Sequence, residues 1–150
     1  MFDSLRIAAS GMSVSRQMMD IIAENIANAN TTNTITGEPY KRKDLIVSSK
    51  PLNNPEEEGI LTVSFGEEFE NQLNAANVVG VRQDNSGFRK VYDPTNPNAD
   101  KDGYVTLPNV NVVEEMAKMI QASRMYEANL SVVESIKTMA TKALETIQQQ

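Results

Sequence analysis

The sequence contains no cysteine, no histidine and no tryptophan. Without cysteine the chain forms no disulfide and has no thiolate chemistry, although this does not fix its compartment. Without histidine it lacks the commonest general base and the commonest transition-metal ligand. The sequence also has no glycine-rich phosphate loop and no nucleophile elbow. These absences argue against an enzyme and against a bound cofactor.

Basic charge and long apolar runs are also scarce. The net charge is -6, and we interpret the single basic run, 41–43, as a solvated strand face and not as a phosphate-binding patch. The acidic pair Glu114 and Glu115 lies near Lys118 on a predicted helix, and we interpret it as a solvated face too. No apolar run has the length of a membrane span, so we expect a protein that is not integral to a bilayer. Residues 1–29 are amphipathic and do not resemble a cleavable signal peptide.

Proline is absent from both ends of the chain. All six prolines lie between Pro39 and Pro108, as do five of the seven glycines. This distribution predicts two domains, a discontinuous helical assembly domain formed by 1–30 and 111–150, and a β-rich middle domain formed by 31–110. The predicted fold class is mainly α, with long terminal helices paired as a coiled-coil-like hairpin and a small β insertion between them.

Residues 111–150 are predicted to form one long helix, with Pro108, Asn109 and Asn111 as its start signal. Its apolar residues recur with a period near 3.5 over about five heptads, which indicates a seam against another helix. At about 1.5 Å per residue this helix is on the order of 55 Å long, which is too long for a compact domain of this size. Part of the seam therefore needs a partner, although simple intramolecular packing is the plainer alternative.

Residues 1–29 are predicted to form the second long helix, capped near Asp3 or Ser4. Gly11 weakens this helix by about 1 kcal/mol relative to alanine, so we expect packing to order it. The two helices have the same seam period and are natural partners. The predicted assembly interface combines both seams: Leu5, Met12, Met19, Ile22, Ile26, Met116, Met119, Tyr126, Leu130, Val133, Leu144 and Ile147.

The middle region shows moderate strand signals at 40–48, 60–65, 78–83, 88–92 and 104–107. Residues 84–87, between two of these strands, are predicted to form a hairpin turn. Residues 51–59 are predicted to form a charged loop, and 67–73 are predicted to form a helical turn or part of a loop.

Residues 98–103 match the opening of a calcium-binding loop, because oxygen donors alternate and glycine occupies the sixth place. The twelfth place holds Asn109 where a bidentate glutamate is needed. A rigid turn rich in Asp, Asn and Pro explains the segment better than a metal site does. A calcium-dependent hydrolase has only this incomplete loop in its support.

Three stretches of the chain carry a family resemblance. The first is 22–31, IAENIANANT, and the second is 37–43, GEPYKRK. The third runs from Tyr92 to Asn129 through DP, PNAD, DGYV, PNV, EM and ASRMYEAN. Together they resemble the flagellar rod, hook and filament family of bacterial axial proteins. The matched positions include Asn25, Asn28, Asn30, Pro39, Tyr40, Asp93, Pro94, Asp100, Asp102, Gly103, Tyr104, Pro108, Asn109, Arg124, Tyr126 and Asn129. Asn96 departs from the family, which often has histidine there, and 48–79 match weakly.

The resemblance implies a structural subunit of the proximal rod of the flagellar basal body, in the periplasmic space. Such proteins are exported unfolded by the flagellar type III apparatus, without cleavage, and assemble helically through their terminal helices to transmit torque for motility. The implied partners are other copies of the chain, other rod proteins, rod-base and MS-ring adaptor proteins, and the export apparatus. The alternative is a cytoplasmic coiled-coil adaptor or chaperone with a small β module. A soluble closed dimer would favour that alternative.

Overall fold

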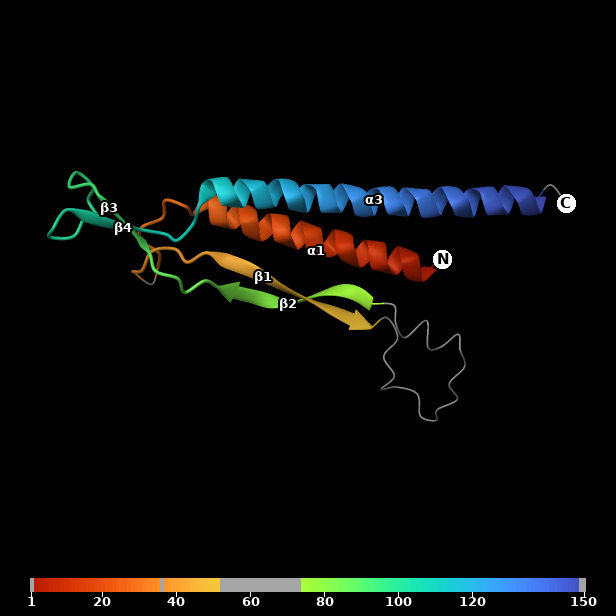
Figure 1. The fold of residues 1–150 in the computed structure, drawn as a ribbon, viewed down its shortest axis with the longest axis horizontal. Coiled ribbons are helices and arrows are strands. Elements are labelled where there is room, and N and C mark those ends of the chain that lie inside the picture. The colour runs from red at the N-terminus through yellow and green to blue at the C-terminus, as the bar shows by residue number, and fades with distance from the viewer. Residues whose placement is uncertain (1, 36, 52–73, 149–150) are drawn as a thin grey trace, which may run out of the picture. The chain divides into compact units, whose positions relative to one another are not determined.

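The computed structural model describes residues 2–35, 37–51 and 74–148. A long helix lies at each end of the chain, α1 at Phe2–Ala27 and α3 at Val112–Gln148. Between them the described residues form four strands, β1 at Lys43–Pro51, β2 at Asn74–Gln83, β3 at Arg89–Tyr92 and β4 at Tyr104–Leu107 (Figure 1). The predicted fold class, paired terminal helices with small antiparallel sheets inserted between them, is confirmed.

The described residues belong to two units, and each contains part of both helices. The first unit comprises 2–16, 47–51, 74–79 and 123–148. The second comprises 17–35, 37–46 and 80–122. The two domains expected from the proline distribution remain a prediction.

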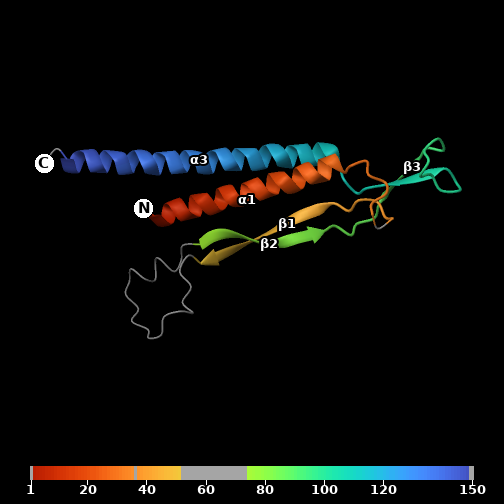
Figure 2. The ribbon, with the colours of Figure 1, turned by 180° about the vertical axis from the view of Figure 1, so that it is seen from behind.

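Within each unit, the segments of α1 and α3 run antiparallel (Figures 1 and 2). In the first unit Gly11 lies against the side chain of Asn129. In the second unit Asn25 bonds to Glu115. The second contact lies two heptads later in the sequence of α1 and two heptads earlier in the sequence of α3. An antiparallel pair with a 3.5-residue period requires this relation.

The buried row of this helix pair combines small and polar side chains with one large aliphatic residue, Ile22. On α1, Ala8, Ser15 and Ile22 are buried at intervals of seven residues, and on α3 the buried residues are Glu115 and Ala122. A Cβ built on Gly11 would lie 2.8 Å from Nδ2 of Asn129, so the absence of a side chain at Gly11 permits the close approach.

The helix ends follow local hydrogen bonding. The Oδ1 atom of Asn111 accepts a bond of 3.2 Å from the Val113 amide, which confirms Asn111 as a start signal of α3. At the end of α1, the Asn28 side chain donates to the Glu24 carbonyl over 2.9 Å. The predicted cap at Asp3 or Ser4 is wrong, because α1 begins at Phe2 and Asp3 lies inside the first turn.

The strands form two separate two-stranded sheets, β1 with β2 and β3 with β4. β3 and β4 are antiparallel, and their register pairs Arg89 with Leu107 and Tyr92 with Tyr104. The rings of Tyr92 and Tyr104 meet edge to face with centroids 5.3 Å apart. β1 begins at Lys43, three residues after the predicted start. The predicted strand 60–65, the predicted segment 67–73 and all but the first residue of the predicted segment 51–59 lie outside the described residues.

The predicted hairpin at 84–87 is wrong, since β2 pairs with β1 and β3 pairs with β4. Contacts with other loops explain the difference. The Asp84 amide donates to the Arg42 carbonyl over 2.8 Å, and the Asn109 side chain donates to the Asp84 carbonyl over 3.2 Å. The segment therefore connects two sheets and does not close one.

The segment 93–103 is a series of turns that the side chains of Asp93, Asn96 and Asp100 stabilise. The Oδ1 atom of Asp100 accepts from the amides of Asp102 at 3.0 Å and Tyr104 at 2.8 Å. Gly103 has φ of +80°, the left-handed conformation that favours glycine. The turn interpretation is confirmed. The described residues contain no group of three acidic side chains that could hold a metal ion. No helix in the same residues is long and apolar enough to cross a membrane.

Candidate functional site

The most heavily bonded part of the second unit lies where α1 ends and α3 begins. We call it the helix junction, and define it by Asn25, Tyr40, Arg42, Lys43, Asn109, Glu115 and Lys118. Ala29, Tyr40 and Val110 pack beside it as a small apolar core. The junction joins the end of α1, the start of β1 and the first turns of α3.

Asn25 is the centre of the junction and is 1% exposed. Its Nδ2 group donates to the Lys43 carbonyl over 2.8 Å and to Oε2 of Glu115 over 2.9 Å. Its Oδ1 atom accepts from the Tyr40 hydroxyl and from the Lys43 amide, both over 2.9 Å. Both donor hydrogens and both acceptor lone pairs of the amide are therefore used.

Glu115 is a buried carboxylate, 1% exposed, which two cations compensate. Its Oε1 atom lies 3.0 Å from Nζ of Lys118 and 3.5 Å from Nη1 of Arg42. Burial opposes the charge on Lys118, but its bonds to Glu114 and Glu115 outweigh this effect and raise the pKa of Lys118. The solvated-face interpretation is thus wrong for Glu115, because α3 turns this residue toward Asn25.

Arg42 connects the junction to the loops. Its Nη2 atom lies 2.9 Å from Asp44 and 3.0 Å from Asp84. Burial opposes the guanidinium charge, but Asp44, Asp84 and Glu115 together raise the pKa of Arg42. The Oδ1 atom of Asn109 accepts from the Arg42 amide over 3.0 Å. The interpretation of 41–43 as a solvated strand face is therefore wrong for Arg42, whose side chain is 18% exposed.

Tyr40 is a third group at the junction, beside Lys118 and Arg42, whose pKa is raised. Its ring is buried, and its hydroxyl donates to Asn25. Burial, followed by the negative charges of Glu24 and Glu115, raises the pKa of Tyr40 to about 12. The Tyr40 phenol therefore stays a neutral donor at all physiological pH values.

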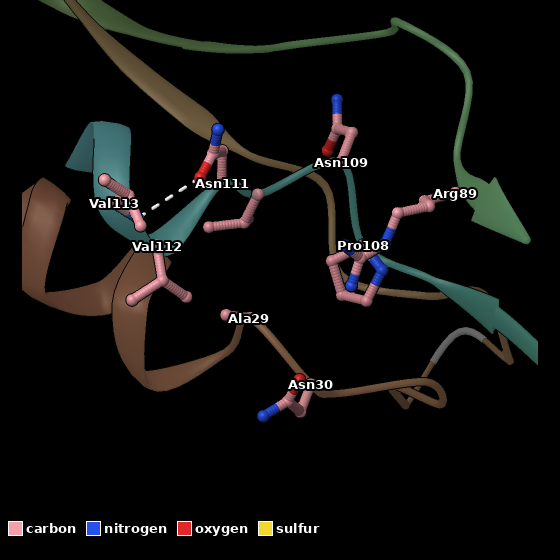
Figure 3. Close-up of a pocket in the computed structure, with 9 residues that line it drawn as sticks. Ala29, Asn30, Arg89, Pro108, Asn109, Asn111, Val112 and Val113 are labelled. Atoms are coloured by element: carbon pink, nitrogen blue, oxygen red, sulfur yellow. Dashed lines mark hydrogen bonds between the residues drawn. The ribbon is translucent and has the colours of Figure 1, made fainter. Parts of the chain in front are cut away.

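A cleft of about 450 Å³ opens beside the junction in the second unit. Figure 3 shows Ala29, Val112 and Pro108 around this opening, with Arg89 reaching toward it from β3. Pro108, Val110 and Ala29 are buried, whereas Val112 and Val113 remain exposed at the rim. The cleft is mainly apolar and has a cationic edge.

The residues of the predicted assembly interface differ in how far the helix pair covers them. Ile22 is buried, and Leu5, Met116, Leu130 and Leu144 are exposed. The side chain of Ile147 lies outside the described residues. The remaining members are half-buried: Met12, Met19, Ile26, Met119, Tyr126 and Val133. One edge of the predicted seam therefore stays at the surface, and its role in assembly stays a prediction.

The positions that carry the family resemblance fall into four places. Asn25, Tyr40 and Asn109 meet at the junction, with Pro39 beside Tyr40, and Asn28 bonds to the end of α1. Asn30 and Pro108 line the cleft. The turns before β4 hold Asp93, Pro94, Asp100, Asp102 and Gly103, and Tyr104 begins β4. On α3, Asn129 lies against Gly11, with Arg124 and Tyr126 on the same helix.

Sequence reasoning missed Glu115, Arg42, Lys43 and Lys118 as junction residues. A signal was present for Glu115, because it stands seven residues before Ala122 and fourteen before Asn129, in the row that faces α1. No comparable periodicity marks Arg42 or Lys43, which lie in and beside a strand.

Comparisons with known proteins agree with the sequence motifs. Residues 5–33 match the family model described as "Flagella basal body rod protein", and residues 101–146 match "Flagellar basal body rod FlgEFG protein C-terminal". The chain is similar to proteins named "Flagellar basal-body rod protein FlgC". The one from Borreliella burgdorferi is 40% identical, over 99% of this chain and 98% of the relative. The one from Bacillus subtilis is 37% identical, over 96% of each. The one from Aquifex aeolicus is 37% identical, over 96% and 95%.

Proposed function

The chain belongs to the FlgC family of flagellar basal-body rod proteins, which are structural subunits of the rod, and from this we propose how it works there. It is a subunit of the proximal rod in the periplasmic space. It leaves the cytoplasm unfolded through the flagellar type III apparatus and without a cleavable signal peptide. In the rod it assembles helically through its terminal helices and transmits torque.

The observation that carries this proposal is a difference between the two sides of the helix pair. One side is buried within the chain, and the other side leaves apolar residues exposed. The inner side is satisfied within one chain, because Asn25 and Glu115 have bonding partners despite full burial. The outer edge leaves Met116, Leu130 and Leu144 exposed. Exposed apolar surface along a helix favours contact with further protein. A contact between unlike faces of identical subunits that does not close gives a helical filament.

The contacts of the helix junction also support a role in torque transmission. It ties α1, β1 and α3 together through bonds to the buried Asn25 and Glu115. Glu115 contacts two cations, Lys118 at 3.0 Å and Arg42 at 3.5 Å. Charge-assisted bonds of this kind are stronger than neutral ones and fix geometry. We expect the junction to keep the second unit rigid under load.

The proposed partners are other copies of the chain, other rod proteins, the rod-base and MS-ring adaptor proteins, and the export apparatus. Cell fractionation tests whether the chain is a component of the basal body. Hook-basal bodies purified from motile cells should contain this chain, and a deletion strain should lack rods and swimming. Recovery of the chain only as a soluble cytoplasmic dimer would contradict the proposal and favour the adaptor or chaperone.

A further inference from the structure

Ile35 is a fully exposed aliphatic side chain at the end of a short turn in the second unit. The Thr34 amide and hydroxyl both donate to the Glu38 carbonyl, over 3.0 and 2.8 Å. The Gly37 amide donates to the Thr34 carbonyl over 2.9 Å, and Gly37 has φ of +79°. These bonds join the backbone of Thr34 to that of Gly37 and Glu38.

The base of this turn is fixed as well. The Tyr40 amide donates to the Thr31 carbonyl over 3.1 Å, and the Asn98 side chain donates to the Thr32 hydroxyl over 2.9 Å. Single exposed aliphatic residues are common and need no explanation by themselves. Ile35 differs because it follows the bonded Thr34, and because a β-branched side chain has few rotamers to lose. Its burial by a partner would therefore cost little conformational entropy.

The same unit contains a surface of matching character, the cleft beside the helix junction. Its apolar lining comes from Ala29, Pro108, Val110, Val112 and Val113. The volume of about 450 Å³ is in the range of sites that enclose small ligands, and so can receive an aliphatic side chain with part of its turn. Ile35 does not fill the cleft of its own chain, because it is fully exposed.

The charges beside the two surfaces are also complementary. Glu38 follows the turn, is exposed, and has one carboxylate oxygen 2.8 Å from Lys41. A carboxylate can accept several donors, so Glu38 has capacity for a second cation. Arg89 stands at the cleft and forms no salt bridge within the described part of the chain.

We infer that Ile35 of one copy inserts into the cleft of a second copy, with Glu38 of the first beside Arg89 of the second. The turn and the cleft are different surfaces of one chain. Each copy can therefore insert its turn into one neighbour and accept the turn of another neighbour in its cleft. Such a contact does not close on itself unless the rotation between copies closes a ring. The inference rests on the proposed role as a rod subunit, because it names a contact between copies in that assembly.

The chain has no cysteine, so in the purified protein a disulfide can form only between introduced cysteines. Engineered disulfides therefore test the contact. Purified Ile35→Cys protein is mixed at high concentration with Val113→Cys protein and oxidised. We expect a covalent dimer from the mixture and little from either variant alone. A chain with both substitutions should give a ladder of multimers. Val112→Cys serves as a second receptor position if Val113→Cys disturbs folding, which circular dichroism checks.

The matched control is Val79→Cys, an exposed aliphatic position of β2 outside the turn and the cleft. The pair of Ile35→Cys with Val79→Cys should cross-link no more than each variant alone. Charge reversal adds an independent readout. Arg89→Glu should lower the yield of the Ile35–Val113 cross-link, and adding Glu38→Arg should restore it.

The same double-cysteine chain is then oxidised in isolated basal bodies. Equal yields for the cleft and control pairs in both samples would overturn the inference. It would also be overturned if Ile35→Cys were captured only by another basal-body protein. If the chain were absent from basal bodies, the rod proposal would fail, while the purified sample would still decide whether the turn enters the cleft.

Discussion

Asn25 shows how a polar side chain can be both fully buried and favourable. It bonds to Tyr40, to the Lys43 backbone and to Glu115, so its removal would leave several buried groups unpaired. Each such group costs about 1–3 kcal/mol. We predict that Asn25→Ala lowers the free energy of unfolding by about 3 kcal/mol or more in urea denaturation. Asn33→Ala, at an exposed position, should change it by less than about 0.5 kcal/mol. Equal effects of the two substitutions would contradict this.

Tyr40 makes the junction sensitive to alkaline pH. Its pKa rises from 10.0 to about 12 in the folded chain, so the native state holds this proton more tightly than the unfolded state. The stabilisation is complete below about pH 10 and is lost as the pH rises toward 12. Because solvent screens part of this interaction, the corresponding stabilisation is about 2 kcal/mol or less. We predict that the free energy of unfolding falls more steeply between pH 10 and 12 in the natural chain than in Tyr40→Phe. Parallel pH profiles would show that Tyr40 does not contribute.

Which residues form the junction was only partly predictable. The motif drew attention to Asn25, Tyr40 and Asn109, because they lie in stretches that resemble a known family. The partner of Asn25 on α3 was not identified, since Glu115 has an acidic neighbour and nearby lysine like any solvated helix face. Whether Glu115 or Glu114 faces inward depends on a rotation of about 100° on the helix, and the apolar pattern alone placed the seam on Met116 and Met119.

At the scale of elements, both helices were predictable and the sheet pairing was not. A period near 3.5 with no proline extends over each end of the chain, so the type and approximate bounds of α1 and α3 follow from local pattern. The hairpin prediction at 84–87 relied on turn residues between two strand signals. Tertiary contacts of Asp84 with Arg42 and Asn109 decided the outcome instead, and such contacts leave no local signature.

Gly11 and Asn129 set how closely the helices approach in the first unit. Gly11→Ala should stabilise an isolated helix by about 1 kcal/mol. In the folded chain its Cβ would lie 2.8 Å from the Asn129 side chain, which must move. We predict that Gly11→Ala gives little or no gain by itself, but a gain of about 1 kcal/mol in an Asn129→Ala background. A double-mutant cycle measures this coupling, and identical gains in both backgrounds would contradict close packing.

Gly103 determines the turn before β4. Its φ of +80° strains other residues, and a Cβ would lie 2.9 Å from the Tyr92 ring and 3.3 Å from Pro94. We predict that Gly103→Val lowers the free energy of unfolding by about 2 kcal/mol or more and increases hydrogen exchange in β3 and β4. Gly80→Val is the control, because a Cβ there has no heavy atom within 4 Å. Similar losses from both variants would show that the strained turn is not responsible.

At the scale of the whole molecule, some apolar residues of the helix pair are buried within one chain and others stay exposed. Ala122 is fully buried between the helices, whereas Leu130 is 41% exposed. Polar substitution should therefore act differently at the two positions. Ala122→Asp places an unpaired charge in a packed site and should prevent folding. Leu130→Asp should preserve the folded monomer, with a change of less than about 1 kcal/mol in its free energy of unfolding.

The composition of hook-basal bodies from cells whose only copy carries Leu130→Asp tests the central claim most directly, namely that the exposed edge of the helix pair is an assembly surface of a rod subunit. We predict that the variant is produced at normal levels and exported. We also predict that it is missing from purified basal bodies and that the cells do not swim. Swimming cells, with the variant in their basal bodies at the level of the natural chain, would contradict the claim.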